Sequence, residues 1–406
     1  MPNNTNTLNA TCPACGLLCD DIRIEGATAH NACAKGIAFF TQTIANPQPL
    51  VSGKPATLEE AVKRAAEILK QSQRPVIAGL STDIHGMRAL TPLAAKLKAD
   101  LQHINQASLQ RNMQAMQSAG WFTTTLSEVK NRADVIVCIG TDIVTHNPRF
   151  FERFVWVKDA MFTDPSARKI VYLGGEKLDK TPGREGAWAL PSRPALEGSS
   201  RGAADLPDIL AALNALLLNK PLKADTVAGI AMADLQKLAE TLKQAKYAVL
   251  TWAAKDLDFP HASLAVQQIT NIVGTLNQTT RAAGLPLGGS DGDYSINNVH
   301  AWQTGKVLSD MQNAKPDAQI WVNSYNADAP PSLSEVPTIV LGNTNTPNMS
   351  WFSHADVFIP VATPGLDCSG TMMRVDSSIS LPLKQVRESG LPTLAEVVRK
   401  LEALLA

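Results

Sequence analysis

Short apolar runs alternate with amphipathic segments along most of the chain after residue 50. The runs have the length and composition of strands that are buried on both faces of a parallel sheet. In the first half of the chain they are PVIAGL (75–80), DVIVCIG (134–140) and KIVYLGG (169–175). Apolar residues at helical spacing predict helices over 56–71, with Thr57 as N-cap and Glu60 three positions later, and over 89–100.

The same alternation returns after a stretch rich in Gly, Pro and Ser, residues 176–207, which predicts at most short strands. Strands are predicted at 247–254, 318–325, 338–343 and 356–362, and helices at 206–219, 233–245, 261–278 and 393–406. Strands that alternate with helices in this way favour parallel sheets. We therefore predict an α/β fold in which a small cysteine-bearing module is followed by two Rossmann-like α/β domains.

The domain boundaries follow from the linker NPQPLVSGKP and from the Gly/Pro-rich middle. The first module is predicted to cover residues 1–50. The first α/β domain is predicted to cover residues 51–205, and the second residues 206–406.

Charge and hydropathy exclude several classes of protein. The chain of 406 residues has 37 Lys+Arg and 37 Asp+Glu, so its net charge is +0 and predicts no general nucleic-acid surface. No apolar run is long enough to span a membrane, and the polar N-terminus MPNNTNTLNA does not resemble a signal peptide. We therefore expect a cytoplasmic protein without a membrane partner, in which clustered cysteines indicate a metal more often than a disulfide.

Four of the 6 cysteines lie in the first 33 residues, with the spacing C-x2-C-x3-C-x13-C. They are Cys12, Cys15, Cys19 and Cys33. Four thiolates suit a [4Fe–4S] cluster or a structural zinc ion. Three ligands in one loop and a fourth from afar favour the cluster over zinc, and a loop without metal is the third alternative.

The other two cysteines are weaker candidates for chemistry. Cys138 lies inside an apolar strand and is expected to be a small buried hydrophobic residue. Cys368 lies on a glycine-bearing loop after a strand, but no activating base accompanies it in the sequence.

Ligands of parallel sheets bind beyond the carboxyl ends of the strands. Two glycine-bearing loops lie in such positions and offer hydrogen-bonding groups. One supplies Thr363, Gly365, Asp367, Ser369, Gly370 and Thr371, and the other supplies Gly288, Gly289 and Ser290 before a helix near 295–303. Ordinary turns are the alternative. The second loop is not a simple anion site, because Asp291 and Asp293 follow directly.

Motifs of common enzyme classes are missing. The sequence contains no Walker A motif, no G-x-G-x-x-G that opens a helix and no H-E-x-x-H. The 7 histidines are dispersed, so no hydrolytic triad or zinc hydrolase site can be assembled from the sequence.

Four separated segments, in order, resemble the B subunit of formylmethanofuran dehydrogenase, a member of the molybdopterin oxidoreductase superfamily. They are TCPACGLLCDDI with NACAKG, GWFTTTLSEVKNRADVIVCIGTD, AGLPLGGSDGDYSINNVHAWQTG and ADVFIPVATPGLDCSGTMMRVD. The resemblance implies that the four N-terminal cysteines bind an iron–sulfur cluster and that the two glycine-bearing loops are pterin loops.

The chain departs from this family where the family holds its tungsten or molybdenum. That ligand is a cysteine or selenocysteine, usually followed by histidine, ahead of the segment that matches QAMQSAGWF. No cysteine lies between Cys33 and Cys138, and Ser108 falls near the expected position. The W/Mo pterin is therefore predicted to be absent, and the pterin loops to be vestigial.

This departure points to the non-redox branch of the family, the formyltransferase/hydrolase complex of methylotrophic bacteria. The implied role is a noncatalytic scaffold subunit in tetrahydromethanopterin-linked formaldehyde oxidation to formate, with the other subunits as partners. The polyglutamyl tail of a methanofuran-type carrier is a further implied partner. A basic strip could hold that tail, although a solvated surface is the favoured interpretation; the residues are Arg149, Arg153, Lys158, Arg168 and Lys169.

Two alternatives remain. The first is an active redox subunit of a formylmethanofuran dehydrogenase, with W/Mo pterin bound through Ser108 as the only candidate ligand. The second is an independent small-molecule binding module with a structural zinc.

Overall fold

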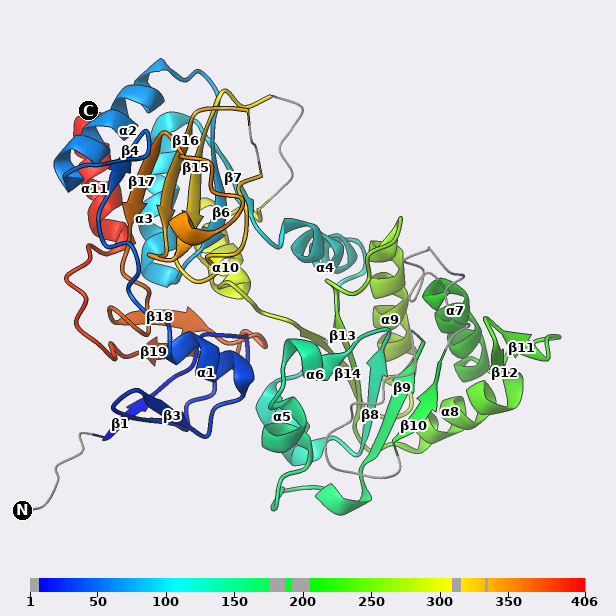
Figure 1. Cartoon of the computed structure of the whole chain (residues 1–406). Helices are drawn as coiled ribbons and strands as arrows, with labels where there is room; N and C mark the ends of the chain where they lie inside the picture. Colours follow the sequence, from blue (N-terminus) through cyan, green and yellow to red (C-terminus); the bar gives the residue numbers. More distant parts are fainter. Residues whose placement is uncertain (1–6, 175–186, 192–204, 309–314, 333–334, 406) are drawn as a thin grey trace, which may run out of the picture. The chain divides into compact units, whose positions relative to one another are not determined.

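The computed structural model describes residues 7–174, 187–191, 205–308, 315–332 and 335–405 (Figure 1). These residues form two compact units, and each unit contains its own mostly parallel sheet. Unit 1 combines residues 1–106, 289–374 and 379–406, and unit 2 combines residues 107–288 and 375–378. The predicted α/β class is confirmed. No helix among the described residues has the length and hydrophobicity that a membrane span requires.

Unit 1 is built on a seven-stranded sheet in the order β5-β4-β17-β16-β15-β6-β7. Neighbouring strands from β17 to β7 are parallel, whereas β4 and β5 are antiparallel additions at one edge. The strands are β4 (Leu50–Val51), β5 (Lys54–Pro55), β6 (Pro75–Ser81), β7 (Asp100–His103), β15 (Ala318–Asn323), β16 (Thr338–Gly342) and β17 (Val357–Pro360).

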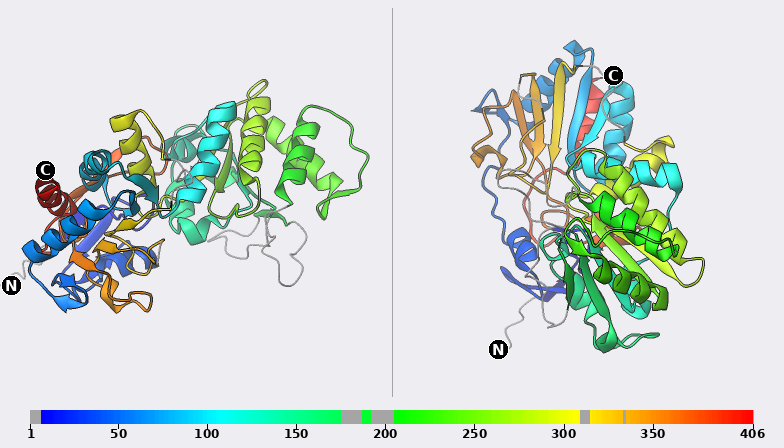
Figure 2. Two further views of the ribbon diagram at one scale, coloured as in Figure 1. Left: turned by 90° about the horizontal axis from the view of Figure 1, so that it is seen from above. Right: turned by 90° about the vertical axis from the view of Figure 1, so that its right-hand side faces the viewer.

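Helices cover one face of this sheet. They are α2 (Leu58–Gln71), α3 (Ile84–Leu97), α10 (Asp293–Thr304) and α11 (Leu394–Leu404). Their apolar sides share one core with alternate strand residues such as Ile77 and Ile339, and Figure 2 shows α3 and α11 on the same side of the strands. The intervening residues, such as Val76 and Phe358, pack on the other face against Phe352 and Leu50.

Capping residues explain where several of these helices begin. Thr57 and Glu60 form the predicted capping box at α2, and Thr393 and Glu396 form another at α11. The helix predicted at 89–100 starts earlier, after Asp83, whose carboxylate accepts a hydrogen bond from the Gly86 N–H.

Smaller elements complete unit 1. An N-terminal antiparallel sheet contains β1 (Thr7–Ala10), β2 (Ile22–Glu25) and β3 (Thr28–His30), and α1 (Ala34–Phe40) follows it. A hairpin contains β18 (Gly370–Met373) and β19 (Ser380–Leu383). A short 3-10 helix, η3 (Thr346–Asn348), follows β16.

Unit 2 is built on a five-stranded parallel sheet in the order β10-β9-β8-β13-β14. Its strands are β8 (Val135–Ile139), β9 (Lys169–Leu173), β10 (Trp188–Leu190), β13 (Ala248–Ala253) and β14 (Ala282–Leu287), and a small hairpin adds β11 (Thr226–Val227) and β12 (Ile230–Ala231). Its long helices are α4 (Gln106–Ala119), α7 (Leu206–Leu217), α8 (Met232–Gln244) and α9 (Ala262–Leu276). Its short ones are α5 (Leu126–Arg132), α6 (Ile143–His146), the π-helix η1 (Phe151–Val155) and the 3-10 helix η2 (Pro165–Ala167).

The division into units differs from the three contiguous domains predicted from the sequence. The predicted boundary at 205/206 falls inside unit 2, and the predicted first α/β domain is shared between both sheets. The physical reason is long-range pairing: β6 pairs with β15, and β8 pairs with β13. Apolar runs identify strands but do not reveal which strands pair.

Two further differences concern the loops. The stretch 282–287, for which no strand was predicted from the sequence, is strand β14, which pairs with β13 in register from Ala282 to Leu287. The Gly/Pro-rich middle contains the short strand β10, which agrees with the prediction of at most short strands there. Residues 175–186 and 192–204 of this stretch lie outside the described part of the chain.

Candidate functional site

The cysteine loop joins β1 to β2 in unit 1. Cys12, Cys15 and Cys19 are buried on this loop, and the Cys12 N–H donates to the Cys19 carbonyl over 2.9 Å. Cys33 is half-buried and is the N-cap residue of α1, although its side chain makes no capping hydrogen bond. Helix α1 approaches this loop closely, since a Cβ at Gly36 would lie 3.3 Å from the Cys12 Sγ.

The electrostatics of the loop show that the four thiols influence one another. Burial raises the pKa of Cys12 well above its ordinary value, and charge on Cys15, Cys19 and Cys33 raises it further. Burial likewise raises the pKa of Cys15 to about 11. Backbone hydrogen bonds from Ala14 and Leu17 act in the opposite direction and lower the pKa of Cys12 and Cys15 respectively.

This donor set fits an iron–sulfur cluster. A buried thiolate is stabilised by metal charge and by backbone N–H donors, and both Cys12 and Cys15 receive such donors. A single zinc ion would require four sulfur atoms about 2.3 Å from one point. Among the described residues, no group of three or more His, Cys, Asp or Glu side chains is found that could hold a metal ion. In a cluster each sulfur binds a different iron atom, so the thiols need not converge on one point.

Buried polar side chains gather at the carboxyl edge of the seven-stranded sheet in unit 1. They follow β6, β15, β16 and β17, in the position expected for a ligand site. They are Thr82, Asp83, Ser324, Asn343 and Thr363. Hydrogen bonds join several of them: the Thr363 hydroxyl donates to the Ser324 carbonyl over 3.0 Å, and the Asn343 amide donates to Thr363 Oγ1 over 3.2 Å.

The predicted loop 363–371 lies at this edge and is held by a buried carboxylate. Asp367 accepts hydrogen bonds from the Thr363 N–H at 3.1 Å and from Arg387 Nε at 2.6 Å. Gly365 adopts a φ of +84°, and its N–H donates to the Cys368 carbonyl. Ser369 is exposed, so it does not take part in the buried edge.

Gly370 and Thr371 meet Asp83, a residue that the sequence pattern did not single out. The Thr371 N–H donates to Asp83 Oδ2 over 3.0 Å, and His85 Nε2 lies 3.2 Å from the Thr371 hydroxyl. A Cβ at Gly370 would lie 2.8 Å from the same Asp83 oxygen. The position of Asp83, three residues after the predicted strand 75–80, is the signal that could have identified it.

The predicted loop 288–290 is divided between the two units. Ser290, in unit 1, accepts a hydrogen bond from the Asn105 amide at 3.0 Å, and the carbonyl of Asp291 contacts His103 Nε2 at 3.2 Å. Burial lowers the pKa of His103 to about 4, so this side chain is a neutral structural partner of the loop. Gly288, in unit 2, exchanges two hydrogen bonds with Asn147 instead.

Three hydroxyls of unit 1 in this region are buried without a hydrogen-bond partner among the described residues. They belong to Thr82, Ser324 and Tyr325. Burial raises the pKa of Tyr325 well above its ordinary value, and charge on Asp83, Cys368 and Asp291 adds to the effect. Unpartnered buried hydroxyls are rare, because each loses its hydrogen bonds to water without replacement. This edge therefore fits a polar ligand with several hydrogen-bonding atoms.

The cysteine loop packs next to this edge. Leu18 shares an apolar cluster with Met372 and Leu383, against which Tyr325 packs, and the Phe39 ring lies 6.3 Å from the Tyr325 ring. The two predicted sites of unit 1 are thus neighbours, although their residues are far apart in the sequence.

The thiolate that holds tungsten or molybdenum has no counterpart among the six cysteines, all of which are described. Besides the four N-terminal ones, Cys138 is fully buried within β8, where burial raises its pKa strongly. Cys368 lies in the loop 363–371, where burial first and then charge on Asp83, Asp367 and Glu396 raise its pKa to about 12. Ser108 lies in the first turn of α4. Neither Cys138 nor Cys368 lies in the segment ahead of residues 114–122, where the resemblance places the thiolate ligand.

Unit 2 also gathers polar groups at the carboxyl edge of its sheet. His146 Nε2 lies 2.6 Å from Asp256 Oδ1, and the Thr141 hydroxyl donates to Asp256 Oδ2 over 2.5 Å. Thr141 and His146 come from the segment that follows β8, and Asp256 comes from the loop after β13. The threonine donates to the carboxylate and not to the imidazole, so this is not the arrangement of a nucleophile with its base.

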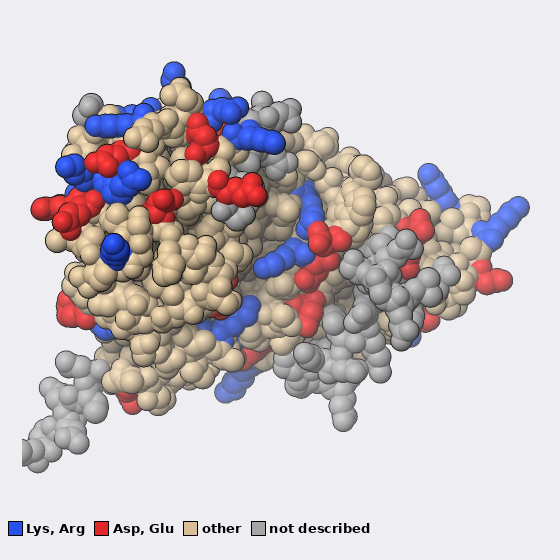
Figure 3. All heavy atoms as spheres, turned by 45° about the horizontal axis from the view of Figure 1, so that its top comes forward, with Lys and Arg blue, Asp and Glu red and all other residues tan. Residues whose placement is uncertain are grey.

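Two arginines of the predicted basic strip have structural roles. Arg149 is buried and forms an ion pair with Glu152 at 2.6 Å. Arg168 is also buried, and its guanidinium donates to the carbonyls of Phe154, Val155 and Lys130. Both are therefore unavailable to a carrier tail, which corrects that part of the sequence interpretation. On the face drawn in Figure 3, cationic and anionic side chains are interspersed.

Comparison with family models finds no match. Comparison with curated proteins finds the B subunit of tungsten-containing formylmethanofuran dehydrogenase 2. The protein from Methanococcus maripaludis is 23% identical over 97% of both chains. The one from Methanocaldococcus jannaschii is 23% identical over 93% of both. The B subunit of the formyltransferase/hydrolase complex Fhc from Methylorubrum extorquens is 25% identical over 79% of this chain and 87% of the relative.

Two solved structures share the fold. A chain of the formyltransferase/hydrolase complex FhcABCD from Methylorubrum extorquens, solved with methylofuran, has a TM-score of 0.71 at 23% identity and covers 88% of this chain and 98% of its own. Acetylene hydratase from Pelobacter acetylenicus has a TM-score of 0.66 at 13% identity and covers 98% of this chain and 69% of its own. The predicted resemblance is confirmed: the chain is a relative of the B subunits of formylmethanofuran dehydrogenase and of the formyltransferase/hydrolase complex.

Proposed function

We propose that this chain is a noncatalytic scaffold subunit of a formyltransferase/hydrolase complex in one-carbon metabolism. Its partners are the other subunits of that complex, and its place is the cytoplasm. In methylotrophic metabolism the complex takes part in tetrahydromethanopterin-linked formaldehyde oxidation to formate. The carrier is a methanofuran-type molecule, in keeping with the methylofuran in the FhcABCD structure.

The observation that carries this proposal is the placement of the cysteines. The resemblance places the usual tungsten or molybdenum ligand, a cysteine or selenocysteine, ahead of residues 114–122, and no cysteine lies between Cys33 and Cys138. Cys138 lies within β8 and Cys368 lies in the loop 363–371, so neither falls in that segment. The chain retains the fold of its relatives while it lacks this group, which supports a role in assembly.

The N-terminal cysteines support a second part of the proposal. Cys12, Cys15, Cys19 and Cys33 would hold a [4Fe–4S] cluster, and zinc is the alternative. Such a cluster carries one electron at a time in redox relatives. In a subunit without a second redox centre, its contribution is to fix the N-terminal module by joining the loop to α1.

The glycine-bearing loops are proposed to be remnants of pterin loops. The residues are Thr363, Gly365, Asp367, Ser369, Gly370, Thr371, Gly288, Gly289 and Ser290. The support is the buried polar edge of unit 1, where three hydroxyls have no partner among the described residues. Asp367 and Asp83 hold the first loop in place.

The test is purification of the native protein under anoxic conditions, followed by metal analysis and identification of the co-purifying proteins. We expect about four iron atoms per chain, no tungsten or molybdenum, and counterparts of the other subunits of the FhcABCD complex. Stoichiometric tungsten or molybdenum with bound pterin would overturn the scaffold role and establish an active formylmethanofuran dehydrogenase subunit. A monomer that carries about one zinc ion would instead indicate an independent binding module.

A further inference from the structure

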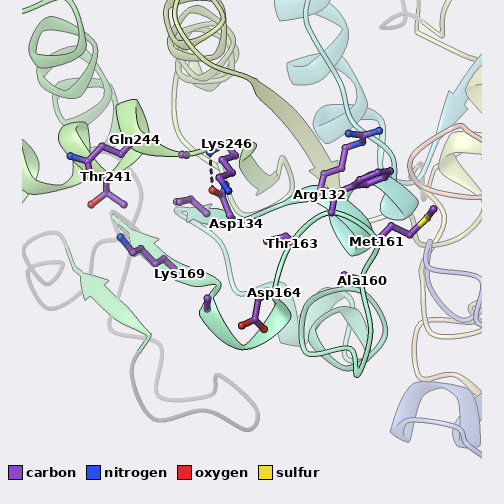
Figure 4. Close-up of a pocket in the computed structure, with 14 residues that line it drawn as sticks. Arg132, Asp134, Ala160, Met161, Thr163, Asp164, Lys169, Thr241, Gln244 and Lys246 are labelled. Atoms are coloured by element: carbon purple, nitrogen blue, oxygen red, sulfur yellow. Dashed lines mark hydrogen bonds between the residues drawn. The ribbon is translucent and has the colours of Figure 1, made fainter.

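A pocket lies at the amino edge of the five-stranded sheet in unit 2, at the opposite ends of the strands from the His146–Asp256 pair. Its volume is about 660 Å³. Figure 4 shows its walls, which come from the ends of α5 and α8, from the starts of β8 and β9, and from the loop 160–164. Small-molecule ligands of parallel sheets bind at the carboxyl edge, so this position is unusual for a cofactor.

The charged groups without a partner in the pocket wall are cationic. Both carboxylates in its wall already have donors: Asp134 accepts from the backbone N–H groups of Lys246 and Tyr247, and Asp164 accepts from Ser166. The ammonium groups of Lys169 and Lys246 form no ion pair or hydrogen bond with described residues. By contrast, Lys243, in the last turn of α8, is bonded to Glu240 and Asn219.

Large apolar side chains line the same pocket. Met161 and Phe162 are consecutive and are 74% and 57% exposed. The guanidinium of Arg132 lies over the Phe162 ring, 4.1 Å from its centroid. Exposed methionine and aromatic side chains beside an arginine have the composition of protein–protein interfaces, in which these residue types are enriched.

We propose that this pocket docks an acidic segment of a partner subunit, with carboxylates on Lys169 and Lys246 and an apolar side chain on Met161 and Phe162. The proposal rests on the proposed function, which makes the chain a subunit of a complex. The two unpaired lysines favour an occupant with carboxylates. The exposed side chains of Met161 and Phe162 favour a protein segment over a small anion, because a small anion would leave them uncovered. None of the residues involved belongs to the cysteine loop or to the polar edge of unit 1.

The experiment uses the complex purified through a tag on this chain. Lys169→Glu/Lys246→Glu reverses both free charges, and Lys220→Glu/Lys223→Glu makes the same charge change on exposed lysines of unit 2 outside the pocket. We expect the amount of one partner subunit that co-purifies with the pocket variant to fall by about tenfold or more at physiological salt. The control variant should retain as much of that subunit as the wild-type chain does. Met161→Ser/Phe162→Ser should lower the retention of the same subunit. Circular dichroism checks that each variant is folded.

A second readout identifies the occupant. Carbodiimide coupling joins a lysine amine directly to a carboxylate that touches it. Coupling of Lys169 or Lys246 to an Asp or Glu of a partner subunit is the expected result. Coupling only to Asp134 or Asp164 of the same chain, together with full partner retention by the folded pocket variant, would overturn the docking proposal and leave the scaffold role intact. If the wild-type chain brings no partner at all, the scaffold role fails, and the docking proposal fails with it.

Discussion

Arg387 and Asp367 form an ion pair that spans 2.6 Å from Nε to Oδ1 and holds the loop 363–371 against the sheet of unit 1. The Asp367 side chain is only 3% exposed, and that of Arg387 is 26% exposed. The second carboxylate oxygen of Asp367 accepts a hydrogen bond from the Thr363 N–H. The buried carboxylate therefore joins Thr363, which follows β17, to Arg387. Asp367 thus fixes the loop through one hydrogen bond within it and one ion pair to a residue outside it.

Arg387→Ala should therefore destabilise unit 1 markedly. The substitution leaves a nearly buried carboxylate without its cationic partner, and we expect a loss of about 2–3 kcal/mol in the free energy of unfolding. Urea titration followed by circular dichroism measures this loss. The control is Arg23→Ala, which removes an exposed pair with Glu25 and should change stability by less than about 1 kcal/mol. Equal effects of the two substitutions would contradict the role given to Asp367.

Gly370→Ala should disturb the contact between the loop and Asp83. The new Cβ would lie 2.8 Å from both Asp83 Oδ2 and the Pro364 Cβ, so one of them must move. We expect a loss of about 1–3 kcal/mol, measured by thermal unfolding. Gly274→Ala, in α9, is the matched control: its Cβ meets nothing within 4 Å, and an alanine in a helix should stabilise by about 0.5–1 kcal/mol.

Cys15→Ser should remove the proposed cluster. Iron should fall from about four atoms per chain to near zero, with loss of the visible absorption of the anoxically purified protein. Cys368→Ser is the control, because Cys368 lies outside the cysteine loop, and it should retain its iron. Unchanged iron in Cys15→Ser would show that this thiol is not a ligand, and about one zinc ion per wild-type chain would favour the zinc alternative.

Asp256 should make stability depend on pH in the acidic range. Although burial alone would raise its pKa, hydrogen bonds from His146 and Thr141 outweigh burial and lower it. A carboxylate with a lowered folded pKa stabilises the protein above its unfolded pKa of about 3.9, and this stabilisation is lost as the pH falls through the folded value.

Asp256→Asn should therefore cost about 1–3 kcal/mol at neutral pH and progressively less in acid. Unfolding free energies of the two proteins, measured at several pH values below neutrality, provide the comparison. If the difference in unfolding free energy between the two proteins stays constant down to the most acidic condition, the pKa of Asp256 is not lowered by folding. Asp258→Asn, on the same loop and largely exposed, should show a much smaller change.

The local elements of this fold were predictable because their signals are local. The capping box of α2 consists of two residues three positions apart, and the buried strands β6, β8 and β9 are continuous apolar runs. The loops of the candidate site were also predictable, since glycines after a buried strand are visible in the sequence.

The partners of those loops were not predictable from one sequence. Asp83 and Thr371 are 288 residues apart, and Arg387 reaches Asp367 across a hairpin. Strand β14 resembles a loop in the sequence because Gly284 and Pro286 interrupt its apolar pattern, whereas pairing with β13 supplies its hydrogen bonds. Arg168 has the sequence context of a surface cation, but three carbonyl groups accept its hydrogen bonds in a buried position.

The pairing of β6 with β15 has a consequence for biosynthesis. At a ribosomal rate of about 5–20 residues per second, roughly 10–50 seconds separate the synthesis of these two neighbours. During that interval the edge of β6 that pairs with β15 is open, and all five strands of the smaller sheet are synthesised before β15. The sheet of unit 2 can thus form first. The open edge of β6 must be protected from pairing with other strands until β15 is synthesised. We therefore expect chaperones to bind the nascent chain.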